Sequence, residues 1–168
     1  RDWERVWPSL AQQFELHAID MLGFGKSDKP PDFSYSISAS ADQWQLLAEA
    51  RGLSTVRIVA HDYGNTVAQE LLARLLQQAW DSATMPELLS SLPTNGLDGT
   101  LRRSRATPGR AHLKTGSLRD VVGVAGYVLA DSGRRYVLVA IINHPQANAA
   151  RPALDALVQW SLRDAPSR

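Results

Sequence analysis

The sequence predicts an α/β chain built in two dissimilar parts: a partial parallel sheet, followed by a partial α+β segment. Up to about residue 79, stretches with helical spacing alternate with short strand-like runs, the order typical of a parallel α/β sheet. After about residue 111, two long runs rich in Val and Ile flank a turn, and one amphipathic stretch follows them. The composition, 44% apolar and 21% charged over 168 residues, is ordinary for a globular chain.

Each element of the first part follows from a local pattern. Ser38 is a possible helix N-cap, and Gly52 is a C-terminal stop. The expected order is helix 3–14, strand 14–19, a Gly- and Pro-rich loop at 20–31, helix 38–51, buried strand 56–60, a turn at 61–64 and helix 66–79.

The second part has a different pattern. Asp131-Ser132-Gly133 separates two strand-like runs and predicts a hairpin. The expected order is helix 85–92, a loop at 93–108, a strand at 111–114, strands 121–129 and 135–142, and an amphipathic helix 152–162.

Charge and composition exclude several classes of function. A net charge of +1 gives no electrostatic reason to bind nucleic acid. The absence of Cys excludes disulfides and thiolate metal sites, and the four His lack metal-ligand spacing, so we expect no metal and no cofactor. No apolar run approaches the roughly 18 residues of a membrane-spanning helix.

The first candidate site is Asp62. The segment VRIVAHDYGNTVAQELLAR places it between a strand-like run and a helix, with Ala60 and Gly64 as small neighbours. A nucleophile elbow needs such neighbours because its turn is sharp. An Asp there could attack the carbon of an alkyl halide or epoxide and form an ester. The alternative is that Asp62 only caps the helix.

Two stretches of this part, DMLGFGKSDKP (20–30) and HDYGNTVAQELLAR (61–74), resemble α/β-hydrolases of the haloalkane dehalogenase and epoxide hydrolase branch. Within that branch, the two stretches are most similar to mesoderm-specific-transcript-like proteins. The resemblance implies that Asp62 is the nucleophile and that Tyr63 gives a backbone N–H to the oxyanion hole. The His-Gly loop, the later acid and the general-base His of that family have no counterparts in this sequence. Without a base, an ester on Asp62 could not turn over.

The second candidate site is the triplet Lys114-Thr115-Gly116, which stands at a predicted strand. Lys-Thr-Gly is a marker of penicillin-binding proteins and serine β-lactamases. A Lys supplies positive charge, a Thr donates a hydroxyl to the substrate carboxylate, and a Gly lets the substrate approach the strand backbone. A lone triplet is a weak signal, and an exposed strand end is the alternative.

The surrounding blocks strengthen this signal. MPELLSSLPTNGLDGTLRR, KTGSL, AGYVLADSGRRYVLVAIINHP and ARPALDALVQW together resemble the C-terminal part of serine D-alanyl-D-alanine carboxypeptidases of the S13 type. The resemblance implies that Lys114, Thr115 and Gly116 bind the terminal carboxylate and that Ser117 offers a backbone N–H to the oxyanion hole. It also implies a β-lactamase/transpeptidase-like fold for this part. No Ser-x-x-Lys nucleophile motif occurs in the sequence, so the acylated serine is missing.

The two resemblances meet at Leu72-Ala73-Arg74, which suits both. We therefore expect an α/β-hydrolase fragment at 1–74 and a carboxypeptidase fragment at 75–168, joined within one helix. The expected function is an inactive fusion of two hydrolase fragments, natural or produced by mis-joined sequence reads.

Two alternatives remain open: a non-catalytic peptidoglycan- or penicillin-binding module, and an active hydrolase completed by a missing extension or a homodimer. The expected partners are a small-molecule or peptidoglycan-peptide substrate and, through exposed sheet edges, a second copy of the chain. The compartment stays open, because one parent type is mostly cytoplasmic and the other is exported to the cell envelope.

Overall fold

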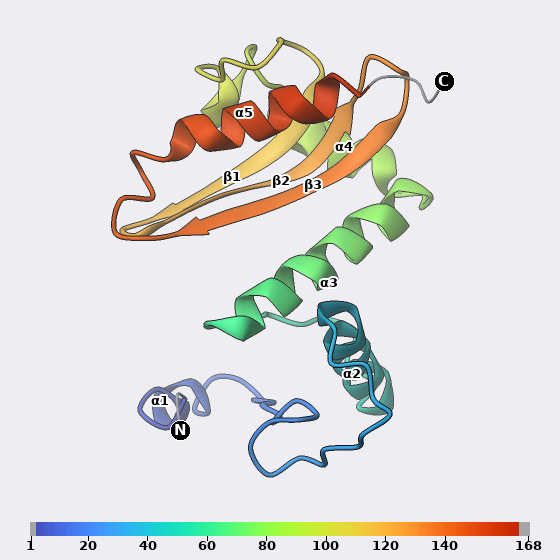
Figure 1. The fold of residues 1–168 in the computed structure, drawn as a ribbon, viewed down its shortest axis with the longest axis vertical. Helices are drawn as coiled ribbons and strands as arrows, with labels where there is room; N and C mark the ends of the chain where they lie inside the picture. Colours follow the sequence, from blue (N-terminus) through green and yellow to red (C-terminus); the bar gives the residue numbers. More distant parts are fainter. Residues whose placement is uncertain (1–2, 165–168) are drawn as a thin grey trace. The chain divides into compact units, whose positions relative to one another are not determined.

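The computed structural model describes residues 3–164. The chain divides into two compact units between Arg57 and Ile58. The elements, drawn in Figure 1, are α1 (Trp7–Leu10), α2 (Ile37–Ala50), α3 (Tyr63–Trp80), α4 (Met85–Ser91), the 3-10 helix η1 (Gly99–Leu101), β1 (Ala111–Leu118), β2 (Val121–Leu129), β3 (Arg135–Asn143) and α5 (Arg151–Leu162).

The first unit holds two helices and a long loop. The side chain of Ser36 caps α2 by accepting a hydrogen bond from the Ala39 N–H at 3.1 Å, so the N-cap lies two residues before the predicted Ser38 and the helix begins at Ile37. Gly52 follows the helix with a φ of 63°, the left-handed conformation that ends many helices. The predicted stop is therefore confirmed, whereas the predicted helix 3–14 is a single short turn, α1.

The predicted parallel sheet is wrong for the residues that the structure describes. Neither residues 14–19 nor residues 56–60 form a strand. A strand needs a neighbour to satisfy its backbone N–H and C=O groups, and neither run has one. The run expected to be buried is largely exposed, with Val56, Ile58 and Val59 at 54%, 57% and 69% exposure.

The predicted α+β architecture of the second part is confirmed. β1, β2 and β3 form an antiparallel sheet in that order, and β1 and β3 are its edges. The turn at Asp131-Ser132-Gly133 joins β2 to β3, and Gly133 has the positive φ, 85°, that the turn requires. The strand predicted at 111–114 extends to Leu118.

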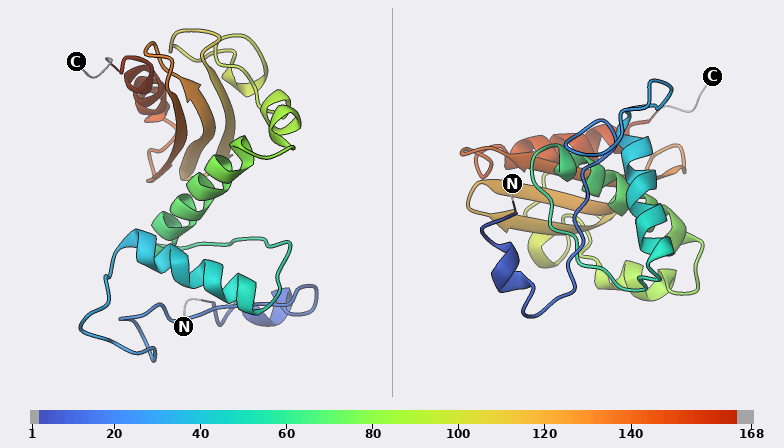
Figure 2. Two further views of the ribbon diagram at one scale, coloured as in Figure 1. Left: turned by 90° about the vertical axis from the view of Figure 1, so that its right-hand side faces the viewer. Right: turned by 90° about the horizontal axis from the view of Figure 1, so that it is seen from below.

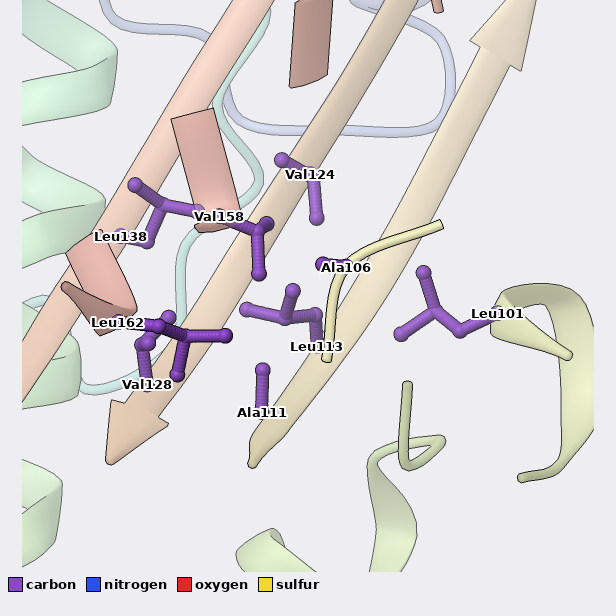
Figure 3. Close-up of a cluster of buried hydrophobic side chains, with 9 residues drawn as sticks. All are labelled: Leu101, Ala106, Ala111, Leu113, Val124, Val128, Leu138, Val158 and Leu162. Carbon is purple, nitrogen blue, oxygen red and sulfur yellow. The ribbon is translucent and has the colours of Figure 1, made fainter. Parts of the chain in front are cut away.

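Helix α5 lies along one face of the sheet (Figures 1 and 2). The core between them is formed by apolar side chains from the strands, from η1 and the loop that follows it, and from α5 (Figure 3): Leu101, Ala106, Ala111, Leu113, Val124, Val128, Leu138, Val158 and Leu162. Burial of these groups is the main force that holds α5 on the sheet.

Helix α3 packs on the opposite face. The Tyr127 hydroxyl donates a hydrogen bond of 2.8 Å to the Leu76 carbonyl of α3, and the Tyr127 ring meets the Trp80 ring edge-on at 5.0 Å. The guanidinium of Arg135 lies 4.2 Å from the centre of the Trp80 ring. Helix α3 is continuous through residues 72–76.

Candidate substrate-binding strand

The Lys-Thr-Gly triplet lies on an edge strand with one open side. In β1, Lys114 pairs with Ala125, Thr115 with Val124 and Gly116 with Gly123 of β2. On the other side, only the start of β1 is covered: the Asn95 N–H donates to the Ala111 carbonyl at 2.9 Å, and the Leu113 N–H donates to the Pro93 carbonyl at 3.0 Å. Between Lys114 and Leu118, no other described strand or loop pairs with this side.

The backbone groups that face the open side belong to Thr115 and Ser117. Residues along an antiparallel strand alternate in the direction of their N–H and C=O groups. Because the groups of Ala111 and Leu113 point outward, those of Thr115 and Ser117 point the same way. An extended peptide could therefore pair here as a fourth strand, which is a recurring mode of peptide recognition.

The side chains of Thr115 and Ser117 lie on the face of the sheet that carries α5. The Thr115 hydroxyl donates a 2.7 Å hydrogen bond to the hydroxyl of Thr100 in η1. The Ser117 hydroxyl accepts a 2.5 Å hydrogen bond from Nη2 of Arg151, the first residue of α5. Both hydroxyls of the strand are thus oriented by groups that come from other elements.

Lys114 brings its charge to the open edge. Its side chain starts from the opposite face, since successive strand residues alternate in direction. The ammonium then turns to the outward-facing carbonyl of Thr115, at 2.7 Å from its oxygen. Lys114 is exposed, so its ammonium remains accessible to an anion that approaches along the edge.

Gly116 leaves open space beside the strand. A Cβ placed on Gly116 would meet no atom within 4 Å. By contrast, a Cβ on Gly126 of β2 would lie 2.2 Å from the His112 carbonyl oxygen. The fold therefore requires the glycine at 126, whereas at 116 it leaves room that a ligand can use.

Asn95 anchors the start of the candidate strand, a role that the sequence analysis missed. Its fully buried side-chain carbonyl accepts hydrogen bonds from the N–H groups of Ala111 (2.8 Å) and Arg110 (3.0 Å). Its amide donates to the carbonyls of Thr107 (2.8 Å) and Ala106 (3.4 Å). In the segment PTNG an Asn is typical of a turn, so only its burial in the structure distinguishes Asn95 from an ordinary turn residue.

Thr100 was also missed. It belongs to the DGT loop, for which the sequence alone gives no chemical role. The loop is held in place because the Asp98 side chain accepts a 2.6 Å hydrogen bond from the Thr94 N–H. This arrangement brings the Thr100 hydroxyl to Thr115, 15 residues further along the chain.

The other candidate site lies at the start of α3. Asp62 precedes the helix with φ 51° and ψ −127°, the one positive φ of a non-glycine residue in the described part of the chain. Its side chain makes no capping hydrogen bond, so the alternative role as an N-cap has no support in this geometry. Tyr63 follows as the first helical residue.

The two candidate sites are separate. No hydrogen bond or ion pair joins Asp62 to Lys114, Thr115, Gly116 or Ser117. The histidines of the second part serve local structure: His112 lies 3.4 Å from the Thr94 hydroxyl, and His144 accepts a hydrogen bond from the Gln146 N–H at 3.1 Å. Within residues 3–164, no group of three or more acidic or His side chains is suited to hold a metal ion.

In the same described range, no helix combines the length and the apolar character needed to cross a membrane.

Residues 46–163 match the model of the D-Ala-D-Ala carboxypeptidase 3 (S13) family. The match includes the whole triplet strand, η1 and α5. It confirms the resemblance that the sequence analysis drew from the blocks around Lys114-Thr115-Gly116.

Several curated relatives match parts of the chain. The bovine mesoderm-specific transcript homolog protein is 43% identical over 93 residues, and the human one is 42% identical over 93 residues. These alignments cover 54% of this chain and 28% of each relative. The protein named "Putative hydrolase LipZ" of Mycobacterium tuberculosis is 32% identical over 136 residues, which is 81% of this chain and 41% of that protein.

Among solved structures, penicillin binding protein 4 of Haemophilus influenzae aligns with a TM-score of 0.43 and 18% identity. The alignment covers 74% of this chain and 32% of that structure.

Proposed function

This chain belongs to the D-Ala-D-Ala carboxypeptidase 3 (S13) family, and from that membership we propose that the open edge of β1 binds the C-terminal end of a D-Ala-D-Ala peptide. The observation that carries the proposal is the unpaired side of β1, which presents the backbone of Thr115 and Ser117 next to the Lys114 ammonium. The chain spans less than a third of the first relatives that it matches, so the activity of a complete enzyme is itself part of the proposal.

Each group has a defined role in this proposal. The peptide extends along β1 and pairs with the outward-facing backbone. Lys114 neutralises the terminal carboxylate at the edge, and the hydrogen-bonded pair Thr115 and Thr100 supplies a hydroxyl donor to it. The Ser117 N–H faces the carbonyl that would be attacked, as an oxyanion-hole donor does.

The chemical step needs a nucleophile that the sequence does not contain. A serine carboxypeptidase forms an acyl intermediate on a serine activated by a nearby base. No Ser-x-x-Lys is present, so we expect the chain to bind the peptide without cleaving it. This makes a peptidoglycan-peptide-binding module the function that the site supports best.

Gly116→Ala tests the proposal with little effect on the fold, because the added Cβ meets open space. Calorimetric titration with N-acetyl-D-Ala-D-Ala should show saturable binding to the native chain. Binding to the variant should be at least about tenfold weaker, because the added methyl group fills room that the ligand would use. The matched control is Asn143→Ala, an exposed residue at the end of β3, which should bind like the native chain. An absence of saturable binding by the native chain would refute the proposal.

A second candidate function follows from the geometry of Asp62. A φ of 51° with a ψ of −127° is a strained conformation for a non-glycine residue, as at the nucleophile turn of α/β-hydrolases, although no strand precedes Asp62 among residues 3–61. We propose that Asp62 retains the ability to attack a carbon centre. Its carboxylate would displace halide from an alkyl halide, or open an epoxide with protonation of the alkoxide by solvent, and form an ester.

This second candidate predicts a trapped intermediate rather than turnover. Because no general base is assigned near Asp62, the ester should persist. Incubation with a reactive alkyl halide, followed by intact-mass measurement and peptide mapping, should show one added alkyl group on Asp62. Asp62→Asn should remove it. Equal labelling of both proteins would show that the alkylation is unspecific and would end this assignment.

We also propose that the two parts have separate origins, with the boundary at residues 74 and 75. The hydrolase-like sequence before this boundary and the carboxypeptidase-like blocks after it support separate origins. The family match that begins at residue 46 places the start of carboxypeptidase similarity earlier. Amplification across residues 65–85 from source DNA decides whether one gene encodes both parts. Its failure would mean that the functional questions belong to two separate parents.

A further inference from the structure

We propose that Arg151 is a second carboxylate-binding group of the β1 site, which contacts the C-terminal carboxylate of the peptide from the α5 face. This inference rests on the proposed function. The Lys-Thr-Gly triplet assigns carboxylate binding to Lys114 and Thr115. The structure adds a cation from a different element, 34 residues away from the serine that it contacts.

The Arg151 guanidinium is held in one position although the residue is exposed. Its Nη2 donates to the Ser117 hydroxyl at 2.5 Å and to the Asn148 side-chain oxygen at 3.3 Å, and its Nε lies 3.4 Å from the same oxygen. Asn148 is itself fixed, because its amide donates to the Arg119 carbonyl at 3.2 Å. Little side-chain freedom is therefore left to lose when a ligand binds.

The charge of Arg151 has no carboxylate partner within residues 3–164. Its hydrogen-bond partners are a hydroxyl and an amide oxygen, both neutral. Other arginines of the second unit do meet acids: Arg110 lies 3.3 Å from Asp131, and Arg134 lies 3.7 Å from Asp164. A fixed guanidinium with remaining N–H donors matches the geometry of a carboxylate.

The spacing of the groups suits one carboxylate. Thr115 and Ser117 are two residues apart on the same strand face, which corresponds to about 6.5–7 Å. Two charge-assisted hydrogen bonds of about 2.8 Å, together with the width of a carboxylate, span a distance of that order. A carboxylate between the Thr115–Thr100 hydroxyl pair and Arg151 can thus reach both.

Lys114 and Arg151 approach this position from different directions. Lys114 starts on the face opposite to α5 and reaches the edge through the Thr115 carbonyl. Arg151 comes from the first turn of α5 on the other face. The site therefore clamps the carboxylate between two cations, and Ser117 positions the second one.

The test compares N-acetyl-D-Ala-D-Ala with its C-terminal amide, titrated into the full chain. Arg151→Gln should weaken binding of the acid by about tenfold to a hundredfold, the loss expected for a hydrogen bond to a charged group. Binding of the amide should change by less than about twofold. Arg151→Lys should fall between, because it keeps the charge and loses the forked geometry.

A matched control separates recognition from general electrostatics. Arg119→Gln removes one positive charge from the residue whose backbone carbonyl binds Asn148 and keeps that contact, so it should leave the ratio of acid to amide affinity unchanged. Equal weakening of acid and amide in Arg151→Gln, with a lowered unfolding midpoint, would show that Arg151 only ties α5 to β1 and would overturn the inference. An unchanged affinity for the acid would overturn it too.

A failure of the proposed function can be distinguished from a failure of the further inference. If the native chain binds neither acid nor amide, both the proposed function and the role of Arg151 are refuted. If the native chain binds the acid and only the Arg151 comparison fails, the proposed function stands and the further inference falls.

Discussion

Replacement of Asn95 by Ala tests the claim that this side chain anchors the candidate strand. The change deletes two acceptor interactions, to the N–H groups of Arg110 and Ala111, and two donor interactions, to the carbonyls of Ala106 and Thr107. Ala111 is fully buried, so water cannot replace the lost partner of its N–H.

The expected destabilisation is about 2–4 kcal/mol. One buried backbone donor left without a partner costs about 1–3 kcal/mol, and the part-buried partners add a smaller amount. With a urea dependence of about 2 kcal/mol/M, the unfolding midpoint should fall by about 1–2 M. Binding of N-acetyl-D-Ala-D-Ala should weaken as well, because the register of β1 begins at these hydrogen bonds.

Urea denaturation followed by circular dichroism measures the change. Asn143→Ala, which removes an exposed asparagine from β3, should shift the free energy of unfolding by less than about 0.5 kcal/mol. A similarly small effect of Asn95→Ala would refute the anchoring role.

Three further predictions test the sheet and its surroundings. Gly126→Ala should prevent normal pairing of β1 and β2, because its Cβ would lie 2.2 Å from the His112 carbonyl oxygen; hydrogen exchange of β1 should rise far more than in Gly116→Ala, where nothing lies within 4 Å of the added Cβ. Tyr127→Phe should destabilise the second unit by about 1 kcal/mol in urea denaturation, because it removes the hydrogen bond to the Leu76 carbonyl. Light scattering should show concentration-dependent association through the open edge of β1, and a strictly monomeric chain at high concentration would contradict this.

A fourth prediction, which belongs with these, concerns pH. The pKa of the Asp164 carboxyl is lowered from 3.8 by a hydrogen bond from Ser132, then by one from Tyr136, with a smaller effect of the Arg134 charge. Its ionised form therefore favours the folded state above about pH 4, and this contribution is lost as the pH falls through the lowered pKa. The difference in urea midpoint between the native chain and Asp164→Asn should shrink from pH 7 to pH 3; a constant difference would contradict it.

The sequence predicted the second unit better than the first because local and tertiary signals agree there. The runs 121–129 and 135–143 are rich in β-branched residues, a turn separates them, and they pair with each other. Their partners are close in sequence, so the pattern contains both sides of the interaction. The runs 14–19 and 56–60 carry a similar local signal but have no adjacent partner in the chain, and a strand signal without a partner does not make a strand.

The candidate site was predictable only in part, for a related reason. Lys114, Thr115 and Gly116 are contiguous, and together with the sequence blocks around them they predict a carboxylate-binding strand. Thr100 and Arg151 join the site through contacts over 15 and 34 residues, which no local pattern records. The sequence thus predicts the strand of the candidate site, whereas the contacts of Thr100 and Arg151 with it depend on the packing of η1 and α5.

Binding and catalysis differ in which groups the fold has to bring together. The binding groups of β1 need only a strand edge, a loop and the start of one helix, and all three lie in the unit that has a formed core. A covalent step needs a nucleophile and its base within hydrogen-bond reach of each other, and these groups come from separate parts of a fold. Asp62 has a strained backbone conformation and no assigned base, and the carboxylate site proposed for β1 has no Ser-x-x-Lys motif in this sequence. Under the proposed functions, each site is therefore expected to bind a ligand or to react once. For this reason binding constants and trapped adducts, rather than rates, are the measurements that distinguish the proposed functions.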